Sequence, residues 1–223
     1  RSIDTVTGTL TVDRGVIDTV PQPHADGTRI FFGDDFESQS QTEYSDGEQL
    51  DVKLLPTTSL GTLDLSLAPA DSITSDARFI RPYPPGRVRL DGTAYPAELF
   101  GPLIVTWAHR DRTQQTAGLI DQDAGDIGPE PGTTYTIRVI DRSNSQQLVE
   151  KTGLTGTTYD DSDGADTLTP TTAPVSIRVE LEAYRDGWQS WQTHQVDTQR
   201  RGYGFAFDDD QGNLTYGGFA PNA

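Results

Sequence analysis

The chain has 223 residues, of which 33% are hydrophobic, and no apolar run is long enough to span a bilayer. Asp and Glu number 34 against 17 for Lys and Arg, and the resulting net charge of −17 repels phosphate backbones, which disfavours nucleic-acid binding. Cys is absent, so disulfides, thiolate metal sites and a cysteine nucleophile are excluded.

The charged residues are uneven in type, because 26 are Asp and only 8 are Glu, and 15 are Arg against 2 Lys. Surfaces rich in Asp and poor in Lys suit high ionic strength, where salt screens their self-repulsion, and this predicts a marine or halophilic source. Met is also absent and residue 1 is Arg. We therefore expect a processed chain or the C-terminal portion of a longer polypeptide.

Residues 1–80 show short alternating runs bounded by Gly, Asp and Pro, which is typical of strands and turns. We expect strands at 9–12, 28–33, 49–55 and 63–67. These runs predict one small all-β domain of five or six strands.

Residues 81–86 read Arg-Pro-Tyr-Pro-Pro-Gly, and three prolines in four positions remove backbone donors and cannot sit inside a sheet. A domain boundary is predicted here. Alternating apolar residues then recur at regular intervals up to residue 201, which predicts a β-sandwich of about seven strands. The clearest runs are Leu103-Val105-Trp107, Tyr135-Ile137-Val139 and Ile177-Val179-Leu181-Ala183. Residues 202–223, rich in Gly and aromatics, are expected to form an extra strand or a terminal extension that orders against a partner.

Residues 82–201 resemble a fibronectin type III module. Trp107 stands where that fold has its core tryptophan, and 177–183 followed by Arg-Asp-Gly resembles its sixth strand and the turn after it. Ile177 occupies the position of the usual tyrosine-corner residue, so the resemblance implies a variant module.

Most of the chain also resembles the C-terminal part of tail hub or tail-tip proteins of long-tailed bacteriophages and gene-transfer-agent particles. The resemblance is carried by the order and spacing of the strings at 81–86, 106–112, 128–135 and 202–205. It implies a non-enzymatic part of a virion, located at the phage tail tip. It also implies contacts with other tail proteins and attachment to a hub ring that is commonly a homotrimer.

Two pairs of residues suggest acid–base chemistry, but each has a simpler structural explanation. Glu180 and Glu182 lie on one face of a predicted strand at a spacing that glycosidases use, yet Arg178 and Tyr184 share that face. We expect an exposed, salt-bridged ladder there. His109 and Asp111 could orient a general base, but no nucleophile motif accompanies them. We expect instead a hydrogen-bonded loop whose arginines could dock an acidic neighbour.

No cofactor or metal site is predicted. Asp160, Asp161, Asp163 and Asp166 crowd one loop, but the loop lacks the frame of an EF-hand, and clusters are expected by chance in so Asp-rich a chain. The same holds for Asp208–Asp210. The three histidines lack metal-ligand spacing, and Gly125–Gly128 lacks the Lys of a phosphate-binding loop.

Tyr184, Trp188 and Trp191 cluster around the turn after the longest predicted strand. Exposed aromatics stack on sugar rings, so they are the candidate residues for binding a host surface glycan. The alternative is that they pack in the core or an interface, with Trp191 anchoring the last strand.

The sequence therefore predicts an all-β chain in which a small β-domain precedes a fibronectin type III-like sandwich. The expected role is structural, as part of a phage tail hub. The alternatives are a glycan-binding receptor-recognition module and an accessory β-domain of a polysaccharide-degrading enzyme.

Overall fold

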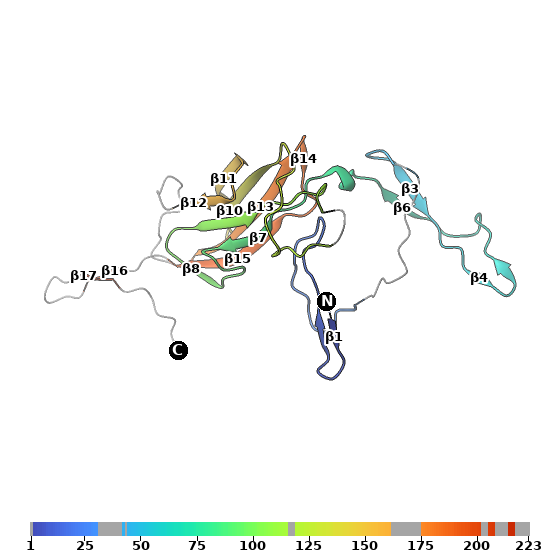
Figure 1. Ribbon diagram of the computed structural model, residues 1–223, viewed down its shortest axis with the longest axis horizontal. Coiled ribbons are helices and arrows are strands. Elements are labelled where there is room, and N and C mark those ends of the chain that lie inside the picture. The colour runs from blue at the N-terminus through green and yellow to red at the C-terminus, as the bar shows by residue number, and fades with distance from the viewer. Residues whose placement is uncertain are drawn as a thin grey trace. The chain divides into compact units, whose positions relative to one another are not determined.

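The computed structural model describes residues 2–30, 42, 44–115, 119–161, 175–201, 205–207 and 214–216. Within these residues the chain is β-structure and loops, with one short 3-10 helix, η1 (Arg78–Ile80) (Figure 1). Among the described residues, no helix is long and apolar enough to cross a membrane. The chain divides into two compact units, one of Arg1–Gln22 with Pro82–Ala223 and the other of Pro23–Arg81.

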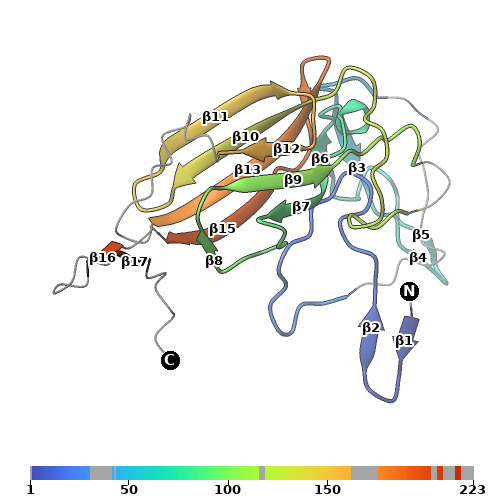
Figure 2. The same ribbon diagram turned by 60° about the vertical axis from the view of Figure 1, so that its left-hand side comes forward.

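The larger unit contains two sheets that pack face to face as a sandwich (Figure 2). In the large sheet the strand order is β11-β10-β13-β15-β8, with β14 paired to β13, and β8 runs parallel to β15. In the small sheet the order is β12-β9-β7. The bounds are β7 Gly86–Leu90, β8 Glu98–Phe100, β9 Ile104–Ala108, β10 Thr134–Asp141, β11 Gln146–Leu154, β12 Thr158–Asp160, β13 Val175–Arg185, β14 Trp188–Gln189 and β15 His194–Arg201.

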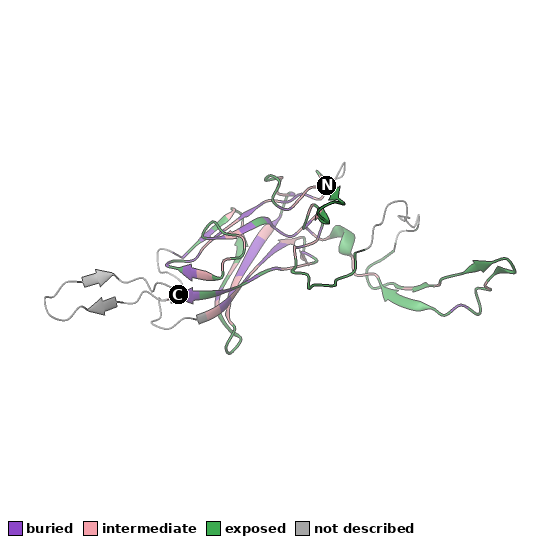
Figure 3. Ribbon diagram, turned by 90° about the horizontal axis from the view of Figure 1, so that it is seen from below, coloured by how far each residue is buried: buried purple, intermediate pink, exposed green. Residues whose placement is uncertain are grey.

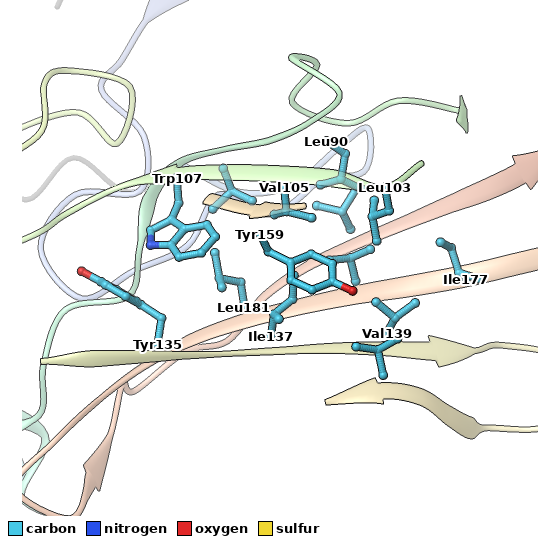
Figure 4. Close-up of a cluster of buried hydrophobic side chains, with 14 of the residues drawn as sticks. Leu90, Leu103, Val105, Trp107, Tyr135, Ile137, Val139, Tyr159, Ile177 and Leu181 are labelled. Carbon is cyan, nitrogen blue, oxygen red and sulfur yellow. The ribbon is translucent and has the colours of Figure 1, made fainter. Parts of the chain in front are cut away.

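The core lies between these two sheets and is built from the predicted alternating residues (Figure 4). Trp107 on β9 packs edge-to-face against Tyr135 on β10, with ring centroids 5.5 Å apart. Alternate residues of β13, from Ile177 to Ala183, are buried on the same face because successive strand residues point to opposite sides. The predicted all-β sandwich is confirmed, and Trp107 is a core residue.

Residues 1–22 belong to the sandwich unit, so the predicted small domain of residues 1–80 is wrong in its N-terminal boundary. They carry a hairpin of β1 (Ser2–Asp4) and β2 (Thr9–Thr11) followed by a segment bound to the sandwich. The buried Arg110 donates from Nη1 to the Gly15 carbonyl at 3.1 Å, and the Val20 N–H donates to Gln192 Oε1 at 2.7 Å. Contacts between such distant segments leave no mark in local sequence pattern.

The Pro23–Arg81 unit is mainly one long hairpin, residues 45–75, which we call the arm. Its base is β3 (Gln49–Val52) paired with β6 (Asp71–Thr74), and its tip is β4 (Thr57–Thr58) paired with β5 (Gly61–Thr62). The predicted strand at 63–67 is wrong, because Asp64 Oδ1 accepts the Ser66 N–H and the Leu67 N–H donates to the Asp64 carbonyl, forming a turn. Residues 28–30 are not a strand, and the rest of that prediction lies outside the described residues.

Burial distinguishes the arm from the sandwich (Figure 3). Ala68 is the one buried hydrophobic residue among the described part of Pro23–Arg81, so this unit has no core comparable with that of the sandwich. In the region 202–223, β16 (Phe205–Phe207) pairs antiparallel with β17 (Leu214–Tyr216). The other residues of this predicted tail lie outside the described residues.

Candidate functional site

The predicted aromatic site lies on the hairpin that joins β13 to β14. Asp186 and Gly187 form its two-residue turn with φ of 51° and 83°. Positive φ at both positions matches the right-handed twist of the flanking strands, and Gly adopts it at no steric cost. Beyond the turn, Tyr184 pairs with Gln189 and Arg185 with Trp188.

This register separates the predicted aromatic residues. Since consecutive strand residues point to opposite faces, Tyr184 and Trp188 lie on opposite sides of the hairpin. Trp191 comes after β14 and before β15, and it is 39% exposed. Trp188 and Tyr184 are half-buried. The three residues are brought to one end of the sandwich but do not form a single flat platform.

Glu182 is the most heavily engaged side chain at this end of the sheet. It is only 1% exposed and forms an ion pair with Arg138 Nη1. Tyr184 Oη donates to its Oε1 at 3.0 Å, Thr193 Oγ1 donates to its Oε2 at 3.1 Å, and Gln189 Nε2 donates to the same Oε2. The predicted exposed ladder is therefore wrong at Glu182, because neighbouring polar side chains close over it.

These contacts also bear on the possible glycosidase pair. Both oxygens of Glu182 accept hydrogen bonds within the protein, and Arg138 also pairs with Glu150 at 2.8 Å. Burial opposes the charge of Arg138, but the hydrogen bonds that it donates to Glu150, Tyr184 and Glu182 outweigh this effect and raise its pKa. An ion-paired carboxylate with occupied oxygens is unsuited to protonating a glycosidic oxygen. Glu182 is a structural residue in this arrangement.

His109 and Asp111 do not meet. His109 Nδ1 lies 2.7 Å from Tyr135 Oη, whereas Asp111 Oδ1 accepts the Thr113 N–H at 2.8 Å and its Oδ2 accepts from Gln114 Nε2 at 2.7 Å. Burial opposes ionisation of Asp111, but the combined effect of these hydrogen bonds is larger, so the pKa of Asp111 is lowered. The geometry is that of a carboxylate capping its own turn, as the expected hydrogen-bonded loop requires.

The arginines of this loop are engaged within the protein, so the expected docking of an acidic neighbour loses its basis. Arg110 is buried and binds the carbonyls of Gly15 and Ile17. Arg112 pairs with Glu130 at 2.9 Å, and Glu130 also pairs with Arg185. The loop therefore holds residues 1–22 against the sandwich, and through Glu130 it is linked to Arg185 at the end of β13.

Among the described residues, no three His, Asp or Glu side chains gather in a way that would hold a metal ion. Asp161 Oδ2 lies 3.7 Å from Arg200 Nη2, so this residue of the acidic loop forms an ion pair with an arginine of the same chain. Asp163, Asp166 and Asp208–Asp210 lie outside the described residues.

A further exposed surface, which was not predicted from the sequence, lies on the arm. Large apolar side chains are exposed in its strands β3 and β6 and in the loops between its strands, and Leu60 at the tip is 99% exposed. Residues 54–70 contain a single charged residue, Asp64, in a chain that is 23% charged. This local absence of charge is the sequence signal from which the exposed surface could have been predicted. The exposed large apolar residues of the arm are Val52, Leu54, Leu55, Leu60, Leu65, Leu67 and Ile73.

Comparison with known proteins finds similarity only at the level of solved structures. No protein-family model matches the sequence, and no curated protein matches it. A Fn3-like protein from Clostridium thermocellum aligns with 53% of this chain and 93% of its own, at 15% identity and a TM-score of 0.30. The FN1–FN3 domains of chicken CNTN1 align with 70% of this chain and 45% of theirs, at 12% identity and a TM-score of 0.31.

At these TM-scores neither likeness carries an argument, and the sandwich stands on its own sheet order and shared core.

Proposed function

We propose that this protein is a non-enzymatic structural component of a phage tail hub or tail tip. In this role the fibronectin type III-like sandwich is a rigid body, and the arm is the surface that contacts neighbouring tail proteins. Repetition around a ring, in a homotrimer such as the resemblance implies, would multiply each contact.

The observation that carries the proposal is the apolar surface of the arm. A free two-stranded ribbon is marginally stable in water, and large exposed apolar patches mark sites of protein contact. Leu54 and Leu60 are 79% and 99% exposed, although the chain as a whole carries a charge of −17. A surface of this kind suits a protein that works inside an assembly. Glu182 and Asp111 are both occupied by hydrogen bonds within the protein and offer no competing catalytic arrangement.

Immunoelectron microscopy tests the assignment to the virion. Antibodies raised against the purified chain are applied to tailed particles from a culture that encodes it. We expect gold label at the distal end of the tail. Label that stays in the particle-free supernatant would overturn the proposal.

Glycan binding through Trp191 is the second candidate, because this side chain is exposed and comes two residues before Thr193, which donates a hydrogen bond to Glu182. Tryptophan fluorescence of the intact chain is titrated with host surface polysaccharide, using Trp191→Ala as the test variant. Phe100→Ala, at a similarly exposed aromatic on β8, is the matched control. A saturable change lost only in Trp191→Ala would support this candidate, and a silent titration would exclude it.

A further inference from the structure

We propose that the turn between β13 and β14 is a site of spontaneous covalent modification, at which Asp186 converts to isoaspartate through a succinimide. The amide nitrogen of Gly187 attacks Cγ of Asp186, and one carboxyl oxygen leaves as water with the amide proton and the carboxyl proton. Water then reopens the five-membered ring at its other carbonyl, so that the main chain runs through Cβ and Cγ. The net change is an isomerisation that needs no enzyme, oxidant or cofactor.

Glycine after the aspartate is what allows the attack, because it has no side chain to crowd the reacting nitrogen. Among the described residues Asp is followed by Gly at four places, at 26–27, 46–47, 91–92 and 186–187. Sequence alone does not rank these four. The structure does, because the reaction needs a carboxyl group and an amide that are both free to meet.

Two of the four places have one of the reacting groups held by a hydrogen bond. The Gly47 N–H donates to the Ser75 carbonyl at 2.7 Å, so the attacking nitrogen is engaged there. Asp91 Oδ1 accepts the Ile104 N–H at 3.0 Å, so there the carboxylate is engaged. The turn that begins at Asp91 has φ of 47° and 80°, close to the 51° and 83° of the turn that begins at Asp186. The backbone geometry of these two turns is therefore matched, and the hold on the carboxylate is what differs.

At the proposed site both groups are accessible. The Asp186 side chain is 76% exposed, and its ion pair with Arg185 Nε, at 3.6 Å, is longer than a hydrogen bond. Within the described part of the chain, the Gly187 N–H donates no hydrogen bond. The strand that follows, β14, has only two residues, so opening the turn breaks few backbone pairs. Asp186 can therefore reach the reactive geometry without unfolding of the sandwich.

Isoaspartate at this position would alter the end of the sandwich that carries the aromatic residues. It adds a carbon to the main chain of a two-residue turn, whose length is what sets the pairing of Arg185 with Trp188. We expect this pair to be lost in the modified chain. Gln189, the next residue of β14, then loses its fixed position as a donor to Glu182.

Ageing of the intact chain at neutral pH and physiological temperature for several weeks tests the proposal. Peptide mapping with electron-transfer fragmentation locates isoaspartate residue by residue. We expect it at Asp186, and also at Asp26, whose carboxylate and following amide make no hydrogen bonds within the described residues. At Asp46 and Asp91 we expect roughly tenfold less, because one hydrogen bond must break before the ring can close.

Two substitutions at the same position sharpen the test. Asp186→Glu keeps the charge but would need a six-membered ring, so we expect no modification there and an unchanged amount at Asp26. Asp186→Asn suits the positive φ of this turn and loses ammonia instead of water, so we expect it to react faster. Tryptophan fluorescence should change on ageing of the wild type and not of Asp186→Glu. Near-ultraviolet circular dichroism before ageing checks that each variant is folded.

Two results would overturn the site: isoaspartate at Asp26 with none at Asp186, or equal amounts at Asp46, Asp91 and Asp186. A fluorescence change that is the same in aged wild type and aged Asp186→Glu would overturn the structural consequence.

Discussion

Glu182 shows what a single buried charge requires at the residue scale. Its carboxylate is removed from water and is stabilised by Arg138, Tyr184, Gln189 and Thr193. Removing one partner of a buried ion pair is costly, since the remaining groups keep their desolvation penalty and lose their interaction. The cluster is therefore a structural clamp between β10, β13 and the segment that leads into β15.

We predict that Glu182→Ala lowers the free energy of unfolding by about 3 kcal/mol. Glu180→Ala is the matched control, two residues away on the same face, where the carboxylate accepts one hydrogen bond from Gln195. We expect the control to cost less than about 1 kcal/mol. Urea denaturation of both variants measures the difference, and equal losses would contradict the clamp.

His194 makes stability depend on pH. It is buried and stacks on Tyr95. Burial, together with the positive charge of nearby Arg89, lowers its pKa from 6.5 to about 4, and Asp123 has a smaller opposing effect. Between those two pH values the unfolded chain binds a proton that the folded chain does not. Stability is therefore fully present above pH 6.5 and falls as the pH drops towards 4, by on the order of 3 kcal/mol.

Urea denaturation between pH 7 and pH 4.5 checks this expectation. Most of the fall in this window is expected to disappear in His194→Gln, whatever the absolute stability of the variant. An unchanged slope would mean that other groups govern the acid sensitivity.

At the scale of elements, the attachment of residues 1–22 depends on a close approach at Gly15. A Cβ there would lie 2.8 Å from Pro21 Cδ and 2.9 Å from Gln122 Cβ. Gly8 has a similar positive φ, 69° against 59°, but a Cβ there meets nothing within 4 Å. Comparing the same substitution at the two positions therefore distinguishes the effect of steric crowding from that of backbone strain.

We predict that Gly15→Ala destabilises this attachment by about 2 kcal/mol more than Gly8→Ala does. Trypsin cleavage after Arg14 is the measurement, because the Arg14 N–H donates to Asp121 Oδ2 and the Arg14 carbonyl accepts the Gln122 N–H. Cleavage in Gly15→Ala should be faster by more than about tenfold. Equal rates in the two variants would show that the crowding is relieved locally.

The elements also show which features a sequence reveals. The alternation in β13 and around Trp107 predicted the core correctly, because a strand with one buried face must repeat every two residues. The same rule failed at 63–67, where Leu alternates with polar residues but Asp64 caps a turn. The ion pair of Glu182 with Arg138 and the binding of Arg110 to Gly15 join residues far apart in sequence, so no local pattern could predict them.

For the whole molecule, the net charge of −17 is the dominant electrostatic fact. Self-repulsion destabilises a compact acidic chain at low salt, and screening removes it. We predict that the thermal midpoint rises by several degrees between low salt and about 1 M KCl, where the Debye length is only about 3 Å, and then levels off. Differential scanning calorimetry measures this. A rise that continues linearly beyond that concentration would indicate cation binding or ion exclusion instead of screening.

The arm is inserted between two segments of a single folding unit, since residues 1–22 and the chain from Pro82 onward belong together. One cut by a protease inside the arm therefore need not release a fragment. The N-terminal piece would stay held by Arg110, Gln122 and Gln192, and the nick would be visible only under denaturing conditions. Such a protein can lose the continuity of its most exposed segment and still keep both ends in place.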